Sequence, residues 1–278
     1  VAIFLSLALT GNFHSWPLNF SCIITISYFV LGYCDDYLKV LKKDTKGISA
    51  SMKLVWQFAT SAIILGVAIH FKIIDTFLYL PFYKGPIVDL GNFYILFGSI
   101  VIVGSSNAVN LTDGLDGLAI GPIITSASTF GILAYAGGHV EISKYLYIPY
   151  IENIGELTVM AAAIVGAGVG FLWFNSFPAQ IFMGDVGSLS IGGGLGAFAV
   201  LTKNEFLFVF IGGVFVIEAL SVILQVLSYK FRKKRIFKMA PIHHHFELSG
   251  WPEPKVIVRF WIISLFLAIF SIATLKIR

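Results

Sequence analysis

The sequence contains few charged residues. Asp, Glu, Lys and Arg make up 12% of its 278 residues, and 57% of the residues are hydrophobic, whereas charged residues form about 25% of an ordinary soluble domain. The mean hydropathy is +0.87. This shortage of charge excludes a soluble enzyme and predicts an integral membrane protein.

Cysteines and long polar stretches are also scarce. The two cysteines, Cys22 and Cys34, fall in one predicted helix about 18 Å apart, which excludes a disulfide between them. The longest polar stretch, 229–255, is too short for a soluble domain with its own core. We therefore expect one integral membrane domain over residues 1–278.

Apolar stretches long enough to cross about 30 Å of hydrocarbon as helices recur along the chain. They lie near residues 18–34, 54–71, 93–111, 118–136, 157–174, 206–228 and 256–275, with a shorter glycine-rich run at 187–201. Residues 1–10 are apolar without a basic flank, and we interpret them as part of a helix cut within its span, not as a signal peptide. The predicted fold class is all-α: a polytopic membrane helix bundle with about eight full spans and a partial N-terminal one.

Basic residues predict the orientation of the bundle. They gather in the segments 39–53 and 230–259, which the positive-inside rule assigns to the cytoplasm. Counting spans from these segments assigns the remaining loops. The cytoplasmic loops are then 112–117 and 175–187, and the loops on the other side are 73–92, 137–156 and 202–205. Every acidic motif described below is thus expected to face the cytoplasm.

Glycines spaced four residues apart occur in two of the predicted spans. They are Gly166 with Gly170, and Gly192 with Gly196. No strand pattern precedes either pair, as a nucleotide-binding loop would require. Close helix packing is the better interpretation of both pairs.

Three short acidic motifs end apolar runs. Aspartate costs roughly 2.5 to 3.5 kcal/mol at mid-bilayer on insertion scales, so several at the membrane edge imply a function. In the first motif, Asp35 and Asp36 diverge by about 100° on a helix, with Lys39 one turn further on. Taken alone, this motif is explained more simply by a solvated helix end held by local ion pairs.

The second motif is Asn110-Leu-Thr-Asp113-Gly-Leu-Asp116-Gly. Its two aspartates are three residues apart and share a face if a helical turn forms there. The glycines that follow them, Gly114 and Gly117, allow the backbone to approach a ligand closely. A capped helix start is the alternative interpretation.

The third motif, Phe182-Met-Gly-Asp185, lies in a connection where Pro178 and two glycines predict a structured loop, with Ser188 as the cap of the next helix. Two carboxylates about 4 Å apart repel each other by roughly 4 kcal/mol at an effective dielectric of 20. Converging aspartates therefore require a cation. Oxygen ligands and a phosphate partner favour Mg²⁺.

A basic run, Lys230 to Lys238, precedes the string Met-Ala-Pro-Ile-His-His-His-Phe-Glu at 239–247. Three consecutive histidines cannot all point the same way on a regular element, which argues against a zinc site. A basic run attracts anionic lipid headgroups, and its cations would serve the binding of substrate phosphates equally well.

Together these motifs resemble one family closely, the prenyl-phosphate hexose-1-phosphate transferases. The resemblance rests on Asp-Asp-x-x-Lys at 35–39, on the motifs at 110–117 and 182–185, and on the histidine string at 239–247, and it covers essentially the whole chain. The histidine string resembles that of the members that transfer phospho-MurNAc-pentapeptide. Family members begin earlier, with a Gly-Thr-Pro-Thr-Met-Gly-Gly string before the aspartate pair. We therefore expect the first helix, part of the second and a substrate-contacting loop to be missing from this chain.

The resemblance implies a reaction of peptidoglycan synthesis at the bacterial inner membrane. Undecaprenyl phosphate attacks the β-phosphate of UDP-MurNAc-pentapeptide, which gives undecaprenyl-diphospho-MurNAc-pentapeptide (lipid I) and UMP and requires Mg²⁺. Phosphoryl transfer depends mainly on positioning and charge stabilisation, which a metal and fixed cations provide. The implied partners are these two substrates and membrane lipid, without nucleic acid, and a homodimer is left open.

The resemblance also implies catalytic roles. It assigns Asp185 to Mg²⁺ and the diphosphate, Asp35 to activation of the lipid phosphate, and Asp36 to support of the metal and phosphate arrangement. A strong base is not needed because the second pKa of a phosphate monoester is about 6. A covalent intermediate on an aspartyl nucleophile stays open as the alternative.

The substrate pocket implied by the resemblance combines all these motifs. Its uridine and diphosphate part consists of Asn110, Asp113, Gly114, Leu115, Asp116, Asn175 and Phe182, with Phe182 stacking on the base. Hydrogen bonds to the nucleotide sugar or phosphates are expected from His243, His244 and His245. Further candidates are Lys43, Lys46 and Lys53.

One carboxylate stands apart from these motifs. Glu218 lies near the middle of an apolar span, beside Gly212 and Gly213. An acid within the membrane faces protein or water, and the resemblance implies a broken helix here that lines a lipid groove. We expect Glu218 to pack inward and to help hold that break.

Three alternative functions stay open. The closest is a UDP-GlcNAc:undecaprenyl-phosphate GlcNAc-1-phosphate transferase. A cation-coupled transporter would use the aspartates and Glu218 for a transported ion, but transporters place such sites near mid-bilayer, often within internal repeats, and the sequence shows neither. A membrane scaffold without catalysis predicts that Asp185→Asn keeps full function.

Overall fold

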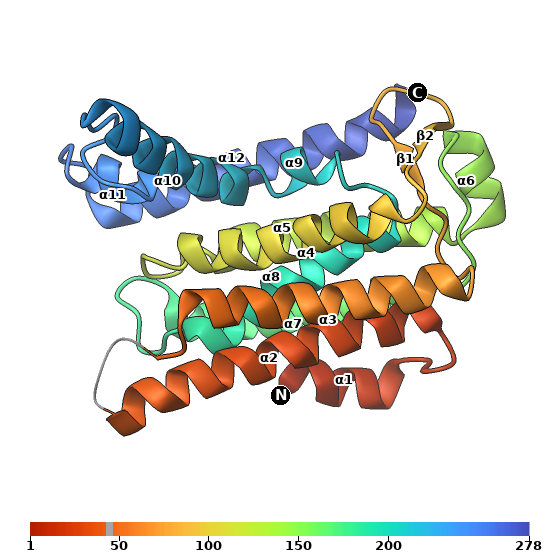
Figure 1. The fold of residues 1–278 in the computed structure, drawn as a ribbon, viewed down its shortest axis with the longest axis horizontal. Coiled ribbons are helices and arrows are strands. Elements are labelled where there is room, and N and C mark those ends of the chain that lie inside the picture. Colours follow the sequence, from red (N-terminus) through yellow and green to blue (C-terminus); the bar gives the residue numbers. More distant parts are fainter. Residues whose placement is uncertain (43–46, 278) are drawn as a thin grey trace.

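The computed structural model describes residues 1–42 and 47–277. Over these residues, eight helices are long and apolar enough to cross a membrane, and they run side by side as a bundle (Figure 1). They are α2 (Trp16–Lys42), α3 (Ala50–His70), α4 (Phe93–Thr112), α5 (Ile120–Gly137), α7 (Glu156–Asn175), α8 (Gly184–Leu201), α10 (Gly213–Arg232) and α12 (Glu253–Ala273), which the 3-10 turn η1 (Thr274–Lys276) extends. The predicted all-α polytopic bundle is confirmed.

Shorter elements connect or extend these helices. They are α1 (Ala2–Thr10), β1 (Phe77–Tyr79), β2 (Pro86–Asp89), α6 (Val140–Leu146), α9 (Phe208–Ile211) and α11 (Ile242–Glu247). The strands β1 and β2 pair antiparallel, a small hairpin that the all-α prediction does not include. Strands this short show too few alternating positions to be read from a sequence.

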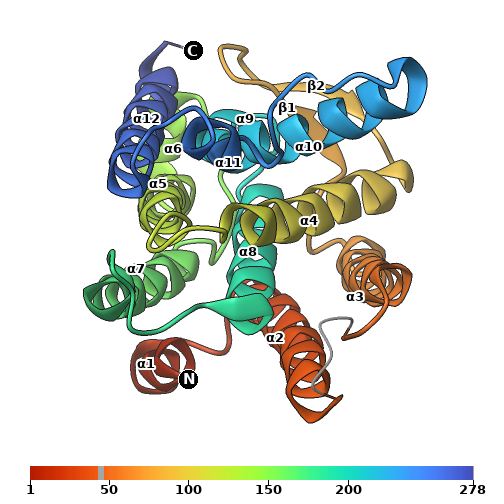
Figure 2. The same cartoon turned by 90° about the vertical axis from the view of Figure 1, so that its left-hand side faces the viewer.

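Helix α8 lies at the centre of the bundle and packs along both α2 and α4 (Figure 2). Glycines make this close approach possible. A Cβ atom at Gly192 would lie 2.8 Å from Cα of Ser106, and one at Gly196 would lie 2.7 Å from Cα of Ile102. Small residues allow membrane helices to pack backbone against backbone, so the predicted packing role of this glycine pair is confirmed.

The other glycine pair does not pack in this way. A Cβ atom at Gly166 or at Gly170 would meet no other atom of the described chain within 4 Å. Both residues lie on the exposed face of α7. The prediction of close helix packing for this pair is therefore wrong within residues 1–42 and 47–277.

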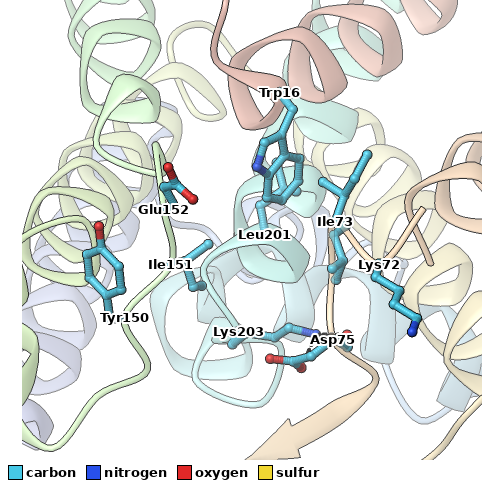
Figure 3. Close-up of a pocket in the computed structure, with 10 residues that line it drawn as sticks. Trp16, Lys72, Ile73, Asp75, Tyr150, Ile151, Glu152, Leu201 and Lys203 are labelled. Atoms are coloured by element: carbon cyan, nitrogen blue, oxygen red, sulfur yellow. Dashed lines mark hydrogen bonds and ion pairs between the residues drawn. The ribbon is translucent and has the colours of Figure 1, made fainter. Parts of the chain in front are cut away.

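The two ends of the bundle carry different segments. The hairpin of β1 and β2 and helix α6 lie at one end, and α11 lies at the other (Figure 1). At the first end, the Lys203 ammonium lies 3.0 Å from Oδ1 of Asp75 (Figure 3), and the Lys84 ammonium lies over the ring of Tyr147. The segments 73–92, 137–156 and 202–205 therefore share an end, as the count of spans predicted.

The apolar run at 206–228 forms two helices and not one. Helix α9 ends at Ile211, and α10 begins at Gly213, where a Cβ atom would press against the side chain of Leu267. From this break α10 leans away from the bundle (Figure 2), and only 22% of its apolar window is buried.

One predicted helix start is wrong, and one helix extends beyond its apolar stretch. Helix α2 continues past residue 34 to Lys42, so Asp35, Asp36 and Lys39 lie on one helix, as their spacing predicted. Helix α8 begins at Gly184, so Ser188 lies one turn inside it, where its hydroxyl donates to the Gly184 carbonyl instead of capping the helix. In both places the end of the helix is polar or glycine-rich, and hydropathy alone does not detect such an end. Cys22 and Cys34 are free, as expected.

The glycine packing of α8 predicts a contrast between two substitutions. Gly196→Ala is expected to lower the free energy of unfolding by about 1 to 3 kcal/mol, because the added methyl group forces α8 away from α4. Gly166→Ala adds the same methyl group in open space and is expected to leave stability unchanged or raise it by up to about 1 kcal/mol through helix propensity. Thermal unfolding of both variants in one detergent measures the difference. Equal melting temperatures would contradict this account of the packing.

Candidate active site

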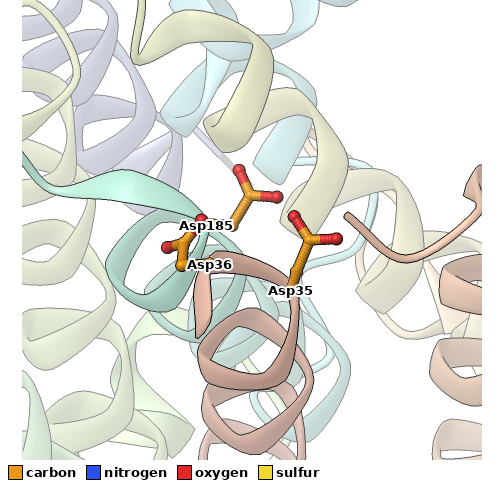
Figure 4. A group of neighbouring side chains, drawn as sticks. All are labelled: Asp35, Asp36 and Asp185. Atoms are coloured by element: carbon orange, nitrogen blue, oxygen red, sulfur yellow. The ribbon is translucent and has the colours of Figure 1, made fainter. Parts of the chain in front are cut away.

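Three carboxylates converge at the end of the bundle where α11 lies. Asp35 and Asp36 come from α2 and Asp185 from the first turn of α8, and an oxygen atom of each lies within 4.8 Å of the others (Figure 4). The helices meet at Gly32, where any Cβ atom would overlap the Asp185 backbone. Asp35 has no exposed surface, so the cluster is partly buried.

Two lysine ammonium groups lie among these carboxylates. The Lys39 Nζ atom is 2.6 Å from Asp35, 3.2 Å from Asp36 and 3.3 Å from Asp185. The Lys53 Nζ atom, from the first turn of α3, is 2.8 Å from Asp35 and 2.7 Å from Asp185. A solvated helix end with local ion pairs is therefore the wrong explanation of the aspartate pair, because the cluster joins three helices around a buried acid.

Hydrogen bonds orient each carboxylate. Asp35 Oδ1 accepts the backbone N–H of Ile48 at 2.6 Å, and Asp36 Oδ2 accepts that of Val186 at 3.2 Å. Asp185 Oδ1 accepts from the side-chain amide of Asn110, which also donates to Ser188. Helix α4 thereby joins α2, α3 and α8 in positioning the site.

The segment between α4 and α5 forms turns and no helix, so the two aspartates of the second motif do not share a helical face. Asp113 ends α4, and burial together with the charge of Asp185 raises its pKa to about 6, although the Gly184 N–H opposes this shift. Asp116 instead accepts the backbone N–H of Ala179 at 2.9 Å. The alternative of a capped helix start is also wrong, because Asp113 is the C-cap of α4 and the N-cap of α5 is Ala119.

The loop 176–183 is tied to this segment. Asp116 holds it through Ala179, and the buried side-chain amide of Asn175 donates to the Ile181 carbonyl at 2.8 Å. The loop presents Phe182, whose side chain is 75% exposed. An exposed aromatic ring thus lies three residues before Asp185 in the chain.

The three histidines point in different directions, as predicted. His243 is fully buried, and its ring lies against Gly114, where a Cβ atom would overlap it. His244 pairs with Glu247, and Nδ1 of His245 accepts the backbone N–H of Lys238. Only His243 reaches the second motif. Leu115 packs with the apolar cluster around α12, and the candidates Lys43 and Lys46 lie outside the described residues.

Two residues of this end were not assigned to the site from the sequence. Lys39 contacts all three carboxylates, and its spacing from Asp35, one helical turn, is the signal that could have identified it. Glu253 of α12 accepts the backbone N–H of Asp116 at 3.1 Å, and no sequence pattern marks that contact because 137 residues separate the partners.

Glu218 packs inward, as expected, with no exposed surface. Its contacts, however, do not reach the helix break at Gly212. Its oxygens contact the backbone N–H of Ile242 and the ring of His243, and not the backbone around Gly212. The expected help in holding the break has no support in these contacts.

Eight apolar helices and a partly buried acidic cluster define a polytopic membrane protein with a candidate active site at one end of its bundle. The model of glycosyl transferase family 4 matches residues 19–203, about two thirds of the chain, and the protein belongs to this family. Its members are phospho-sugar transferases. The protein is therefore a membrane-embedded enzyme of the prenyl-phosphate sugar-1-phosphate transferase type.

The acidic cluster suits the divalent metal that this family generally uses. All its donors are carboxylate oxygens, the set that hard divalent cations prefer. Three carboxylates and two ammonium groups leave a formal charge of −1, so the site attracts further positive charge. Asp36 and Asp185 also keep exposed surface, which a metal arriving with substrate requires.

The raised pKa of Asp113 predicts a pH-dependent effect on stability. The usual value is 3.8 and the folded value about 6, so the folded state binds this proton more tightly and loses stability as the pH rises through that window. Asp113→Asn removes the charge and is expected to stabilise the protein little at pH 4 and by about 2 kcal/mol at pH 7.

Thermal unfolding with a chelator present, from pH 4 to pH 8, measures this effect. Asp116→Asn is the matched control because it removes the same charge from the same segment. It weakens the hydrogen bond to Ala179 and is expected to destabilise the protein at pH 7. A stability gain from Asp113→Asn that does not grow with pH would contradict the assignment.

Proposed function

We propose that this protein transfers phospho-MurNAc-pentapeptide from UDP-MurNAc-pentapeptide to undecaprenyl phosphate, giving lipid I and UMP, with Mg²⁺. The observation that carries the proposal is the convergence of Asp35, Asp36 and Asp185 with Lys39 and Lys53. The contact of the histidine segment with Gly114 supports this particular substrate, since the histidine string resembles that of the members using it.

In the reaction, an oxygen of undecaprenyl phosphate forms a bond to the β-phosphorus, and the bond from that phosphorus to the bridging oxygen breaks. The electron pair leaves with UMP. Asp35, held by Ile48 and by Lys39 and Lys53, orients the lipid phosphate, which is largely ionised at neutral pH. The lysine ammonium groups bind the phosphate oxygens and stabilise their charge.

Asp185 would hold Mg²⁺, with Asp36 beside it. The bound metal supplies neutralisation of the diphosphate charge during transfer. Asn110 orients Asp185 through a hydrogen bond of 2.9 Å, so it serves the metal site as well as the pocket. One-step transfer fits this arrangement, because Asp35 is buried and paired with two cations and is a poor nucleophile in that state.

The nucleotide occupies the space between the second and third motifs. Phe182 offers its exposed face to the uracil ring, and Asp113, Gly114 and Asp116 shape the turn beneath it. Asn175 does not contact the nucleotide directly in this proposal. Its side-chain amide holds the loop that carries Phe182. Lys53 reaches the phosphates from α3, and Lys43 and Lys46 remain candidates for the same task.

We place this end of the bundle in the cytoplasm of a bacterial inner membrane. Lys39 and Lys53 of the first basic segment lie in the acidic cluster, and the second basic segment leads from α10 into α11 at the same end of the bundle (Figure 1). Basic residues at this end are what the positive-inside rule expects of cytoplasmic loops. UDP-sugars are made in that compartment, so a site open to it has access to its substrate. A transporter fits less well, because the acidic cluster lies at the end of the helices and its carboxylates are paired with lysines.

A competition experiment tests the substrate. The protein in detergent receives Mg²⁺, undecaprenyl phosphate and equal concentrations of UDP-MurNAc-pentapeptide and UDP-GlcNAc, each with a different label. We expect label from the pentapeptide substrate to enter the organic phase at least about 100-fold faster, the discrimination available to a site that pairs polar groups of its substrate. Preferential transfer of GlcNAc phosphate would establish the alternative transferase. Cation flux without any lipid product would establish a transporter.

The acidic cluster predicts a second outcome in the same assay. Asp185→Asn removes a charge that holds Lys53 and the metal, and we expect kcat to fall at least about 100-fold. Asp89→Asn, on the exposed hairpin at the opposite end of the bundle, is the matched control and is expected to keep activity within about twofold. Full activity of Asp185→Asn would support a scaffold without catalysis.

A further inference from the structure

A cavity lies at the end of the bundle opposite the acidic cluster (Figure 3), and the proposed reaction does not use it. Its volume is about 390 Å³, within the range of about 300 to 1,000 Å³ that is common for small-molecule sites. Among its lining residues, Trp16 begins α2, Lys72 follows the end of α3, and Leu201 ends α8. Because three spanning helices begin or end here, the cavity lies at the level of the membrane surface.

One wall of the cavity holds an ion pair. Lys203 is 3% exposed, and its ammonium lies 3.0 Å from Oδ1 of Asp75 and 2.5 Å from the Asp75 carbonyl oxygen. The same ammonium lies 4.0 Å from the centre of the Tyr94 ring. These contacts fix the position of Asp75 but involve only one of its carboxylate oxygens. The other oxygen, Oδ2, has no partner within residues 1–42 and 47–277, so it is a free acceptor on a fixed side chain.

Two further charged groups line the cavity, and both are exposed. They are Glu152, between α6 and α7, and Lys72. Neither side chain forms an ion pair or a hydrogen bond in the part of the chain that the structure describes. Since Lys203 and Asp75 neutralise each other, the free charges are one carboxylate and one ammonium group. A ligand that complements both carries a cation and an anion, and is therefore zwitterionic.

Aromatic rings complete the lining. Trp16 is partly buried, and Tyr150 is 50% exposed. Trp and Tyr are common at membrane surfaces, so the two rings by themselves do not indicate a ligand. The face of such a ring attracts cations, however, and here the rings share a cavity with the free carboxylate oxygens of Glu152 and Asp75. This combination favours an ammonium group as the cationic part of the ligand.

An apolar surface lies beside the cavity, at the end of α3. Val67 is 50% exposed and Phe71 is 68% exposed, and residues four apart lie on the same face of a helix. Ile73, which lines the cavity, is 37% exposed. In a bilayer these side chains contact acyl chains. A headgroup in the cavity would have its acyl chains against this surface, which favours a lipid over a soluble zwitterion.

We propose that this cavity binds the headgroup of a zwitterionic membrane lipid with a primary ammonium group, such as phosphatidylethanolamine. The ammonium donates hydrogen bonds to Glu152 and to Oδ2 of Asp75, and the lipid phosphate pairs with Lys72. A primary ammonium has three N–H donors, whereas a quaternary ammonium has none, so the carboxylates select the former. The cavity and the acidic cluster lie at opposite ends of the bundle, and this inference does not depend on the proposed function.

Binding of three lipids with identical acyl chains tests the headgroup. They are phosphatidylethanolamine, phosphatidylcholine and phosphatidylglycerol, each titrated against delipidated protein in detergent, with native mass spectrometry as the measurement. We expect the ethanolamine lipid to bind at least about fivefold more tightly than the other two, the effect of one charge-assisted hydrogen bond. Equal binding of all three would show that the rings and charges contact lipid without selecting it, and would overturn the proposal.

Glu152→Gln tests the carboxylate. Because Glu152 is exposed, the variant is expected to fold with an unchanged melting temperature and to lose the preference for the ethanolamine lipid. The matched control is Glu141→Gln. Glu141 is exposed in the first turn of α6, at the same end of the bundle, but does not line the cavity (Figure 1). We expect this control to keep the preference within about twofold. The same loss in both variants would contradict a specific site.

Lys72→Gly tests the phosphate contact. Lys72 has a φ of 56°, which glycine adopts without strain, so the substitution removes the charge and keeps the backbone. It is expected to weaken phosphatidylethanolamine and phosphatidylcholine by the same factor, about threefold, because both carry the phosphate. A loss confined to the ethanolamine lipid would contradict this contact.

Soluble glycerophosphoethanolamine distinguishes a lipid from a water-soluble ligand. It has the same headgroup without acyl chains, and we expect it to bind at least about 100-fold more weakly than the lipid, because it gains nothing from the apolar surface at the end of α3. Equal affinities of the two would overturn the assignment to a lipid.

Discussion

The structure depends on the attraction between two lysine ammonium groups and three carboxylates at one end of the bundle. Asp35 has no exposed surface, and burying an ionised carboxylate is costly unless cations pair with it. Lys39 and Lys53 provide those cations from α2 and α3, within 2.8 Å of Asp35. The ion pairs in turn require α2, α3 and α8 to meet, so the electrostatics of the site and the packing of the bundle constrain each other.

Glycine satisfies the packing side of that constraint. Gly32 on α2 leaves room for the backbone at Asp185, and Gly192 and Gly196 let α8 lie against α4. A central helix made mostly of small residues gains little from side-chain burial but brings its backbone close to both neighbours. The carboxylates therefore belong to helices that pack closely against each other, and sites built on packed helices are more precise than sites on loops. His243, in contrast, belongs to the short helix α11, whose first residue, Ile242, donates its N–H to the buried carboxylate of Glu218.

Hydropathy predicted the spanning helices because a chain in lipid must satisfy its backbone internally, and helices do this segment by segment. It did not predict where α2 ends or where α8 begins, since those ends are polar and glycine-rich. The grouping of Asp35, Asp36 and Asp185 followed from the chemistry of aspartates at a membrane edge and from the family resemblance. The partner of Glu218 could not be predicted, because the Ile242 N–H lies 24 residues away at the start of α11. The path of the irregular segment that leads to α11 depends on the whole fold.

The family match ends at residue 203, and the histidine segment 239–247 lies beyond it. The match covers residues 19–203 and includes every aspartate and lysine of the acidic cluster. His243 and Glu218 lie beyond it. Residues 19–203 would then carry out phosphoryl transfer, and the segment after residue 203 would select the nucleotide sugar. For selection of the substrate to affect the rate of transfer, the two segments must be in contact. They touch at Gly114, whose missing side chain admits the His243 ring. A residue larger than glycine at position 114 would push the His243 ring away from the 110–117 motif. It would disturb the contact between the two segments without changing any charged group of the acidic cluster.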